Sequence, residues 1–239
     1  MSSYARREID TYERAGTSDT LWDKGLRHQP VWTPGRGKLV VVAPHPDDET
    51  LGAGGLLFIC ARLGIDILVI SVTDGEASHS EWHGLTAVRR NELYRSLGIL
   101  TGGSVEVVHL GVPDGMVQRH ENFLECAIRE HFVEKMTLVA PFERDGHPDH
   151  DCVGRICEKL AAAEDVTLIR YLIWAWHNST PEALRTLRWG RFVLGADAYV
   201  AKMRAIECFK SQIESHFGSI VLGQHVLNYF RRPYEAFLL

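Results

Sequence analysis

Short apolar runs that do not alternate with polar residues recur along this chain, and helical patterns separate them. Strands buried on both faces have this pattern, and they occur mainly in parallel sheets that helices cover on both sides. Successive parallel strands need crossover connections, which helices supply. We therefore predict a mostly parallel sheet. Its expected strands are 39–43, 66–72, 105–110, 137–140 and 166–174.

The helical patterns complete an α/β, Rossmann-like fold with helices on both faces of the sheet, in a single domain over 37–239. Residues 1–36 are charged and interrupted by glycine and proline, so we expect an amino-terminal arm with one short helix that lies on the domain. The arm is also compatible with a subunit contact in a homo-oligomer. The expected helices are 50–59, 85–97, 120–135, 149–163, 198–214 and 218–230.

The turn after the first expected strand carries unusual chemistry. His45, Asp47, Asp48 and Glu49 follow one another closely, and two prolines stop the strand. Carboxylates at this density are costly unless a cation or a helix N-terminus compensates their charge. His45 and Asp48 suit zinc or ferrous iron, and Asp47 would remain a free carboxylate able to take a proton from bound water. An ordinary helix cap at Asp47 or Asp48 is the alternative.

A second histidine motif follows the expected strand at 137–140. His147 and His150 are three residues apart at the start of a helical pattern, so they share one helix face. The carboxyl ends of parallel strands gather at one edge of a sheet, which brings both motifs together. His45, Asp48 and one later histidine would give three ligands with positions left open, as catalytic zinc sites do. A chance pair, in a chain with 12 histidines, is the alternative.

The sequence Pro-His-Pro-Asp-Asp-Glu at 44–49, with His-Pro-Asp-His at 147–150, resembles the N-acetylglucosaminyl-phosphatidylinositol deacetylase-like family, the LmbE-like or PIG-L zinc deacetylases. The resemblance runs from about Lys38 to Leu160, and Pro44 stands where the family usually has alanine. It implies a zinc-dependent N-deacetylase. The expected reaction is hydrolysis of an N-acyl group, most simply N-acetyl, on an amino-sugar conjugate of the glucosamine type.

With this resemblance, we expect His45, Asp48 and His150 to bind one divalent ion. The ion would be Zn²⁺, with Fe²⁺ or another divalent metal as alternatives. It would polarise the amide carbonyl and acidify its bound water. Asp47 would act as the general base on that water, which then attacks the amide.

Further roles also follow from the resemblance. His147 would stabilise the oxyanion or protonate the leaving amine. Asp149 would be its carboxylate partner, because a helix N-terminus alone lowers the pKa of a histidine. Arg89 and Asp114 are expected to bind polar groups of the substrate. A surface ion pair of Arg89 with Glu92, and ordinary turn chemistry at Asp114, are the alternatives.

The expected partner is a small molecule, a polar N-acetylated amino-sugar conjugate. The loops after the strands are polar and rich in glycine, which suits directional hydrogen bonds to hydroxyls. Trp174 and Trp176 would supply an apolar face for a sugar ring. A long acyl-lysine would need a narrow apolar tunnel, which such loops do not predict.

Charge and composition argue against other classes of protein. The net charge is −5, and the chain has no basic run, so we expect no nucleic-acid partner. We expect no integral membrane segment and no secretion signal, and the five cysteines form no Cys-x-x-Cys pair. These features favour a cytoplasmic protein with reduced thiols. Two other functions share the motifs: a metal amidase acting on a thiol or carbohydrate conjugate, and a catalytically silent sugar- or nucleotide-binding protein.

Overall fold

A seven-stranded sheet forms the middle of the computed structural model, which describes residues 16–103 and 105–239. The strands are β1 (Lys38–Ala43), β2 (Ile67–Ser71), β3 (Glu106–His109), β4 (Met136–Pro141), β5 (Thr167–Tyr171), β6 (Trp189–Val193) and β7 (Tyr234–Leu238). They lie in the order β3-β2-β1-β4-β5-β7-β6. Neighbours among the first five run parallel, whereas β7 runs antiparallel to β5 and β6. The predicted α/β fold with a mostly parallel sheet is confirmed.

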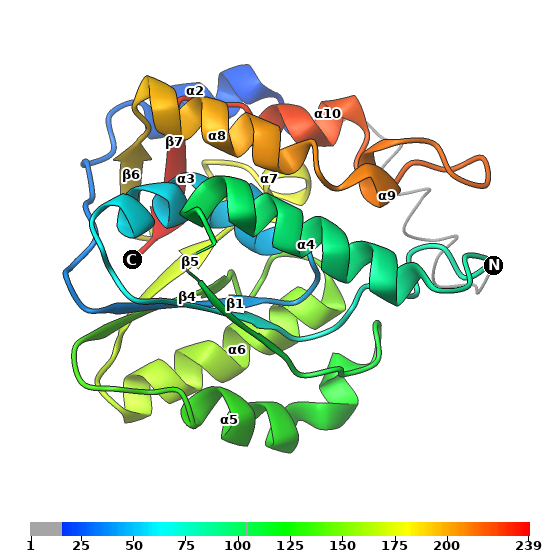
Figure 1. Ribbon diagram of the computed structural model, residues 1–239. Coiled ribbons are helices and arrows are strands. Elements are labelled where there is room, and N and C mark those ends of the chain that lie inside the picture. Colours follow the sequence, from blue (N-terminus) through cyan, green and yellow to red (C-terminus); the bar gives the residue numbers. More distant parts are fainter. Residues whose placement is uncertain (1–15, 104) are drawn as a thin grey trace.

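Helices cover both faces of this sheet, as predicted. They are α2 (Asp19–Leu26), α3 (Asp48–Arg62), α4 (Leu85–Thr101), α5 (Glu121–Arg129), α6 (Pro148–Ala163), α7 (Ala175–Asn178), α8 (Ala196–Ile206), α9 (Lys210–Ile213) and α10 (Gln224–Leu227), with short 3-10 turns η1 (Val117–His120) and η2 (Asn228–Phe230). In Figure 1, α3, α4 and α8 lie on one side of the sheet, and α5 and α6 lie on the other. In the part of the chain that the structure describes, none of the helices is long and apolar enough to cross a membrane.

The unbroken apolar run of β1 follows from this layering. Leu39 and Val41 belong to the core beneath α3, α4 and α8, whereas Val40 and Val42 belong to the core against α5 and α6. All four side chains are buried, because successive residues of a strand point to opposite faces. A polar residue at any of these positions would face a hydrophobic core, which explains why β1 does not alternate.

The last third of the chain departs from the predicted elements. The helix expected at 198–214 is two helices, α8 and α9, which a turn with the fully buried Phe209 separates. The helix expected at 218–230 is a loop followed by the short α10 and η2. The helix expected at 120–135 ends at Arg129. β6 and β7 had no counterpart among the expected strands.

The described part of the arm, from residue 16 onward, packs on the domain through α2. Trp22 is fully buried, and its indole N–H donates to the Trp176 carbonyl at 2.8 Å. The short helix is as expected, but residues 1–15 lie outside the described residues. The division into an arm at 1–36 and a domain at 37–239 stays a prediction.

Buried Glu235 joins β7 to the middle of α3 by hydrogen bonds and to α8 by an ion pair. Glu235 accepts the Gly55 N–H at 2.7 Å and the Leu56 N–H at 2.9 Å, and Lys202 Nζ of α8 lies 2.7 Å from the same carboxylate. α3 is kinked just before these donors, at Ala53, where φ is −141°. The carboxylate therefore caps the second half of α3, the helix whose first turn begins the site.

We expect Glu235→Ala to lower the free energy of unfolding by roughly 3–5 kcal/mol, because the change leaves the Lys202 charge buried without a partner. Urea unfolding measures this quantity. The exposed Lys210–Glu214 pair supplies the control, and Glu214→Ala should change stability little. A Glu235→Ala variant as stable as this control would show that the buried pair does not hold α3.

Candidate functional site

The site lies where the order of the strands reverses. The chain moves outward from β1 through β2 to β3, then crosses over to β4 on the other side of β1. In open α/β sheets, ligands bind in the crevice at this point, outside the carboxyl ends of the strands. His45 follows β1, and His147 and His150 follow β4 at the start of α6. A pocket of about 620 Å³ opens there, and all three histidines line it.

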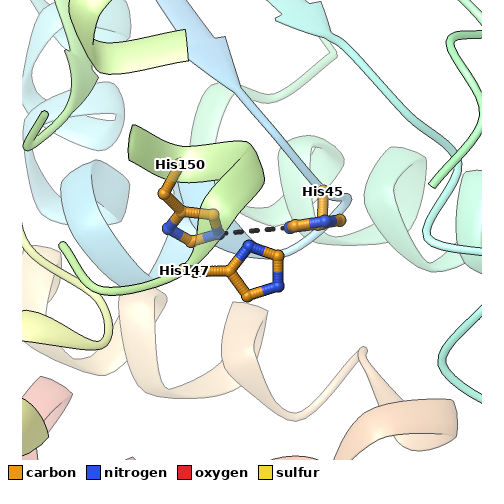
Figure 2. A group of neighbouring side chains, drawn as sticks. All are labelled: His45, His147 and His150. Carbon is orange, nitrogen blue, oxygen red and sulfur yellow. Dashed lines mark hydrogen bonds between the residues drawn. The ribbon is translucent and has the colours of Figure 1, made fainter. Parts of the chain in front are cut away.

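Three atoms that could bind a metal ion lie close together among the residues that line this pocket. His45 Nδ1 lies 3.3 Å from Asp48 Oδ2 and 3.2 Å from His150 Nε2, and the last two atoms are 3.3 Å apart. Figure 2 shows the His45 and His150 rings directed toward one another, with His147 beside them. Ligand atoms around a tetrahedral zinc with bonds of about 2.0–2.1 Å are about 3.3–3.4 Å apart. The donor set and its spacing fit one such ion.

The charges around these atoms favour a cation. Burial alone would raise the pKa of Asp48, but His150 and His45 hold it well below its ordinary value. Burial opposes protonation of His150, yet Asp48 and Asp145 raise its pKa to about 9. A raised histidine pKa means a negative local potential, which attracts a proton or a metal ion alike. The residues therefore suit a positive charge among them.

A second carboxylate orients His150. His150 Nδ1 lies 2.9 Å from Asp145 Oδ2, and the Asp145 carboxylate also accepts the N–H groups of Ile173, Trp174 and Ala175 at 2.9 Å. Metal-binding histidines commonly donate their other ring N–H to a carboxylate in this way. Sequence reasoning missed Asp145. Its only signal was a carboxylate in the turn between β4 and α6, five residues before His150.

Two carboxylates that were expected to have other roles, those of Asp114 and Asp149, lie against the second ring nitrogen of His45. Its Nε2 lies 3.1 Å from Asp114 Oδ1 and 3.5 Å from Asp149 Oδ2. Asp114 also accepts the Ala77 N–H at 3.0 Å, and its carboxylate lines the pocket. Burial would raise the pKa of Asp114, but His45 lowers it well below the ordinary range. Asp114 thus contacts a histidine of the donor set and remains open to the pocket.

His147 caps the first turn of α6. Its Nδ1 accepts the backbone N–H of Asp149 at 3.2 Å, whereas the Asp149 carboxylate accepts the Gly115 N–H at 2.8 Å and lies near His45. Burial raises the pKa of Asp149, but His45 and His147 lower it below its ordinary value. The expected pairing of His147 with Asp149 is therefore a backbone hydrogen bond together with an electrostatic interaction.

Asp47 sits beside the donor atoms in an unusual backbone conformation. Its φ of 147° lies in a region that non-glycine residues rarely adopt. Its N–H donates to Glu49 Oε2 at 3.1 Å, and its carboxylate accepts from Arg89 Nη2 at 3.0 Å. Burial raises the pKa of Asp47 to about 7, although Arg89 opposes the shift. A carboxyl group with this pKa can exchange protons near neutrality.

Arg89 is buried and holds the turn that carries Asp47. It donates to the carbonyl oxygens of Pro46 at 2.8 Å and Gly75 at 2.9 Å as well as to Asp47. The alternative of a surface ion pair with Glu92 is wrong, because both side chains are buried and Glu92 accepts from Ser211 instead. Arg89 also lines the pocket, so it can contact a substrate as expected.

Other groupings of possible ligands exist at the site. One donor atom each of His45, His147 and His150 lie within 4.8 Å of one another, as do donor atoms of His45, Asp114 and Asp149. In the set of His45, Asp48 and His150, all three distances are 3.2–3.3 Å, which matches the edges of one coordination tetrahedron. For this reason we favour this set.

Comparisons with known proteins agree with the motifs. The GlcNAc-PI de-N-acetylase family, PIG-L, matches residues 40–161. A 1D-myo-inositol 2-acetamido-2-deoxy-alpha-D-glucopyranoside deacetylase of Corynebacterium glutamicum (strain R) is 36% identical over an alignment 233 positions long. The alignment covers 77% of this chain and 77% of the relative. A protein of the same name from Corynebacterium diphtheriae is 29% identical over 168 residues, and this chain spans only 56% of its length.

The fold also has solved counterparts. The N,N'-diacetylchitobiose deacetylase from Pyrococcus horikoshii superposes with a TM-score of 0.63, covering 94% of this chain and 93% of that one at 18% identity. At this identity the likeness concerns the fold alone. The family match, in contrast, takes in about half of the chain and contains both histidine motifs, and the C. glutamicum relative extends the likeness over most of it. This chain therefore belongs to the GlcNAc-PI de-N-acetylase (PIG-L) family.

Proposed function

We propose that this chain is a metal-dependent hydrolase that removes an N-acetyl group from an amino-sugar conjugate. The observation that carries the proposal is the triangle of His45, Asp48 and His150 donor atoms, 3.2–3.3 Å apart, at the base of the pocket. The name of the C. glutamicum relative supports the substrate class, because a 2-acetamido-2-deoxy-glucopyranoside contains an N-acetylated amino sugar.

His45 Nδ1, Asp48 and His150 Nε2 would hold the ion, with zinc as the first choice and ferrous iron as an alternative. When bound, such an ion polarises an amide carbonyl and lowers the pKa of a water molecule. Asp145 and Asp114 keep the two imidazoles in orientation by accepting from their second ring nitrogens. Two neutral imidazoles and a single carboxylate would leave the ion and its three ligands with a net positive charge.

Asp47 is the proposed general base. Its carboxylate lines the pocket next to Asp48, and Arg89 fixes its position. Asp47 takes a proton from the attacking water as the new C–O bond forms. Arg89 thus acts first as a positioning residue. A protein that only binds sugars would have no use for a strained carboxylate held in this place, which argues against the catalytically silent alternative.

His147 is proposed to complete the reaction. Because its Nδ1 accepts the Asp149 N–H, a neutral His147 carries its proton on Nε2. That N–H stabilises the oxyanion of the tetrahedral intermediate by a hydrogen bond. When the C–N bond breaks, the proton that Asp47 took from the water passes to the leaving amine, which regenerates the base, and acetate departs. In this proposal His147 acts as a neutral hydrogen-bond donor and not as the charged partner of Asp149 that we expected from the sequence.

Metal content and acetate release test the function together. Zinc-loaded protein should contain about one ion per chain and release acetate from N-acetylglucosamine glycosides, and chelation should abolish the release. His150→Ala should lower metal content sharply, because it removes one of three donors. His131→Ala, a histidine outside the pocket, is the matched control and should retain both properties. Full metal retention in His150→Ala would contradict the ligand set, and acetate release after complete chelation would contradict metal dependence.

Asp47→Asn separates the base from the ligands. We expect turnover to fall roughly 10²–10⁴-fold, the range for loss of a general base, while the metal stays bound. Asp48→Asn is the comparison, since it should lose metal. Steady-state kinetics and elemental analysis on both variants provide the measurement. Equal metal loss in the two variants would mean that the adjacent carboxylates share the ligand role.

Asp145→Asn tests the orientation of His150. We expect metal affinity to fall about 10–100-fold, because the carboxylate no longer fixes the imidazole tautomer. Competition with a chromogenic chelator measures the affinity. Asp66→Asn, which alters a carboxylate that is 70% exposed and outside the pocket, is the control. Unchanged affinity in Asp145→Asn would show that this carboxylate serves only the turn at 173–175.

A further inference from the structure

The pocket has an apolar side that the proposed reaction does not use. Its volume of about 620 Å³ lies within the range of about 300–1,000 Å³ typical of sites for drug-sized ligands. One N-acetylated sugar is smaller than such a ligand, so room remains for a substituent. The sequence predicted polar loops around the site, but several apolar side chains also line the pocket. Besides Ala77, the apolar lining consists of Leu51, Met116, Ile173, Trp174, Val221 and Leu222.

Most of this apolar lining comes from the chain beyond the family match. The match ends at residue 161, whereas Ile173 and Trp174 lie just before α7, and Val221 and Leu222 lie just before α10. We name these four residues the apolar wall. The proposed ligands and base all lie within 40–161. The reacting groups and the apolar wall therefore come from separate parts of the sequence. Trp176, also expected at the site, packs instead against Trp22.

The loop that carries Val221 and Leu222 is anchored to the domain. The Leu222 N–H donates at 2.8 Å to the carbonyl of Gln212, which lies in α9. Buried Glu92 of α4 accepts the Ser211 N–H at 2.8 Å and the Ser211 hydroxyl at 2.6 Å, which fixes α9. The wall is thus preorganised, and a ligand that binds it does not bear the full entropic cost of ordering the loop.

Apolar surface continues from the wall onto the rim of the pocket. Phe217 and Ile220, in the same loop, are 59% and 48% exposed. The Phe217 ring lies 6.0 Å from the ring of Trp82, which belongs to the segment that also contributes Ser78 to the lining. Phe217 and Ile220 thus extend the apolar surface of the loop that carries Val221 and Leu222, and contiguous surface of this kind can take part in ligand binding.

Polar groups for sugar hydroxyls come from a different part of the lining. Ser78, Asp114, Gln118 and Arg119 all line the pocket and all lie within the family match. The wall side chains of Ile173, Val221 and Leu222 offer neither donors nor acceptors, and Trp174 adds a single indole N–H donor. A polar substituent buried against them would lose its hydrogen bonds to water without replacement, whereas an apolar one would gain from burial.

We propose that the apolar wall binds an apolar aglycone, aryl or alkyl, attached to the N-acetylated amino sugar. The wall then determines specificity, while His45, Asp48, His150 and Asp47 supply the reaction. This inference rests on the proposed function for the identity of the sugar. It assigns a role to the segments before α7 and α10, where the sequence had predicted an apolar face only at Trp174 and Trp176.

The test compares three glycosides of N-acetylglucosamine, with methyl, hexyl and phenyl aglycones. We expect kcat/KM to be at least about tenfold higher for hexyl and phenyl than for methyl, mainly through KM. Titration calorimetry with the deacetylated glycosides gives a readout independent of turnover. The hexyl product should bind at least about tenfold more tightly than the methyl product, with a more negative heat-capacity change, the marker of apolar burial.

A near-isosteric substitution links the preference to the wall. Val221→Thr should reduce the hexyl-to-methyl ratio several-fold, both in kcat/KM and in binding, because a hydroxyl replaces a methyl group. Val193→Thr, at a valine of β6 that is 53% exposed, should leave the ratio as in the parent protein. Equal use and equal binding of the methyl and hexyl compounds would overturn this inference alone. If no glycoside is deacetylated while hexyl still binds more tightly, the proposed function fails and the wall stands.

Discussion

A buried carboxylate between two buried imidazoles is the constraint on which the rest of this structure depends. Asp48 lies 3.3 Å from ring nitrogens of both His45 and His150, and all three side chains are largely shielded from water. The sheet order produces this contact, because β1 and β4 are neighbours although about a hundred residues separate the two histidines. Such a concentration of ligand atoms is stable only if a positive charge or further hydrogen bonds compensate it.

The compensation extends outward through carboxylates that bind backbone donors. Asp145 connects His150 to the three N–H groups before and at α7, and Asp114 connects His45 to the Ala77 N–H. Arg89 fixes Asp47 in a comparable way, because its guanidinium donates to the Asp47 carboxylate and to two backbone carbonyl oxygens of the neighbouring turns. Each reacting group is therefore fixed by a residue from another element. Such support keeps side chains in a productive geometry without contributing to the chemistry itself.

The sequence predicted those parts of the site that are local. His45 and Asp48 could be predicted as ligands because they directly follow a buried strand, and the choice of His150 as the third ligand came from the family resemblance. Asp145 could not be predicted, because its backbone partners lie about thirty residues further along the chain. β7 escaped prediction for a similar reason: Glu235 is polar yet buried, and its charge is compensated by Lys202 of another helix. The wall at Val221 and Leu222 depends on contacts of a loop that has no periodic pattern.

Anomalous diffraction from zinc-loaded crystals tests the central claim most directly, because it locates the ion without reference to activity. The account predicts one strong peak within about 2.0–2.2 Å of His45 Nδ1, an Asp48 carboxylate oxygen and His150 Nε2, with Asp47 outside bonding distance. A peak bonded to His147 in place of Asp48, or one bonded to Asp114 and Asp149 on the far side of His45, would contradict it.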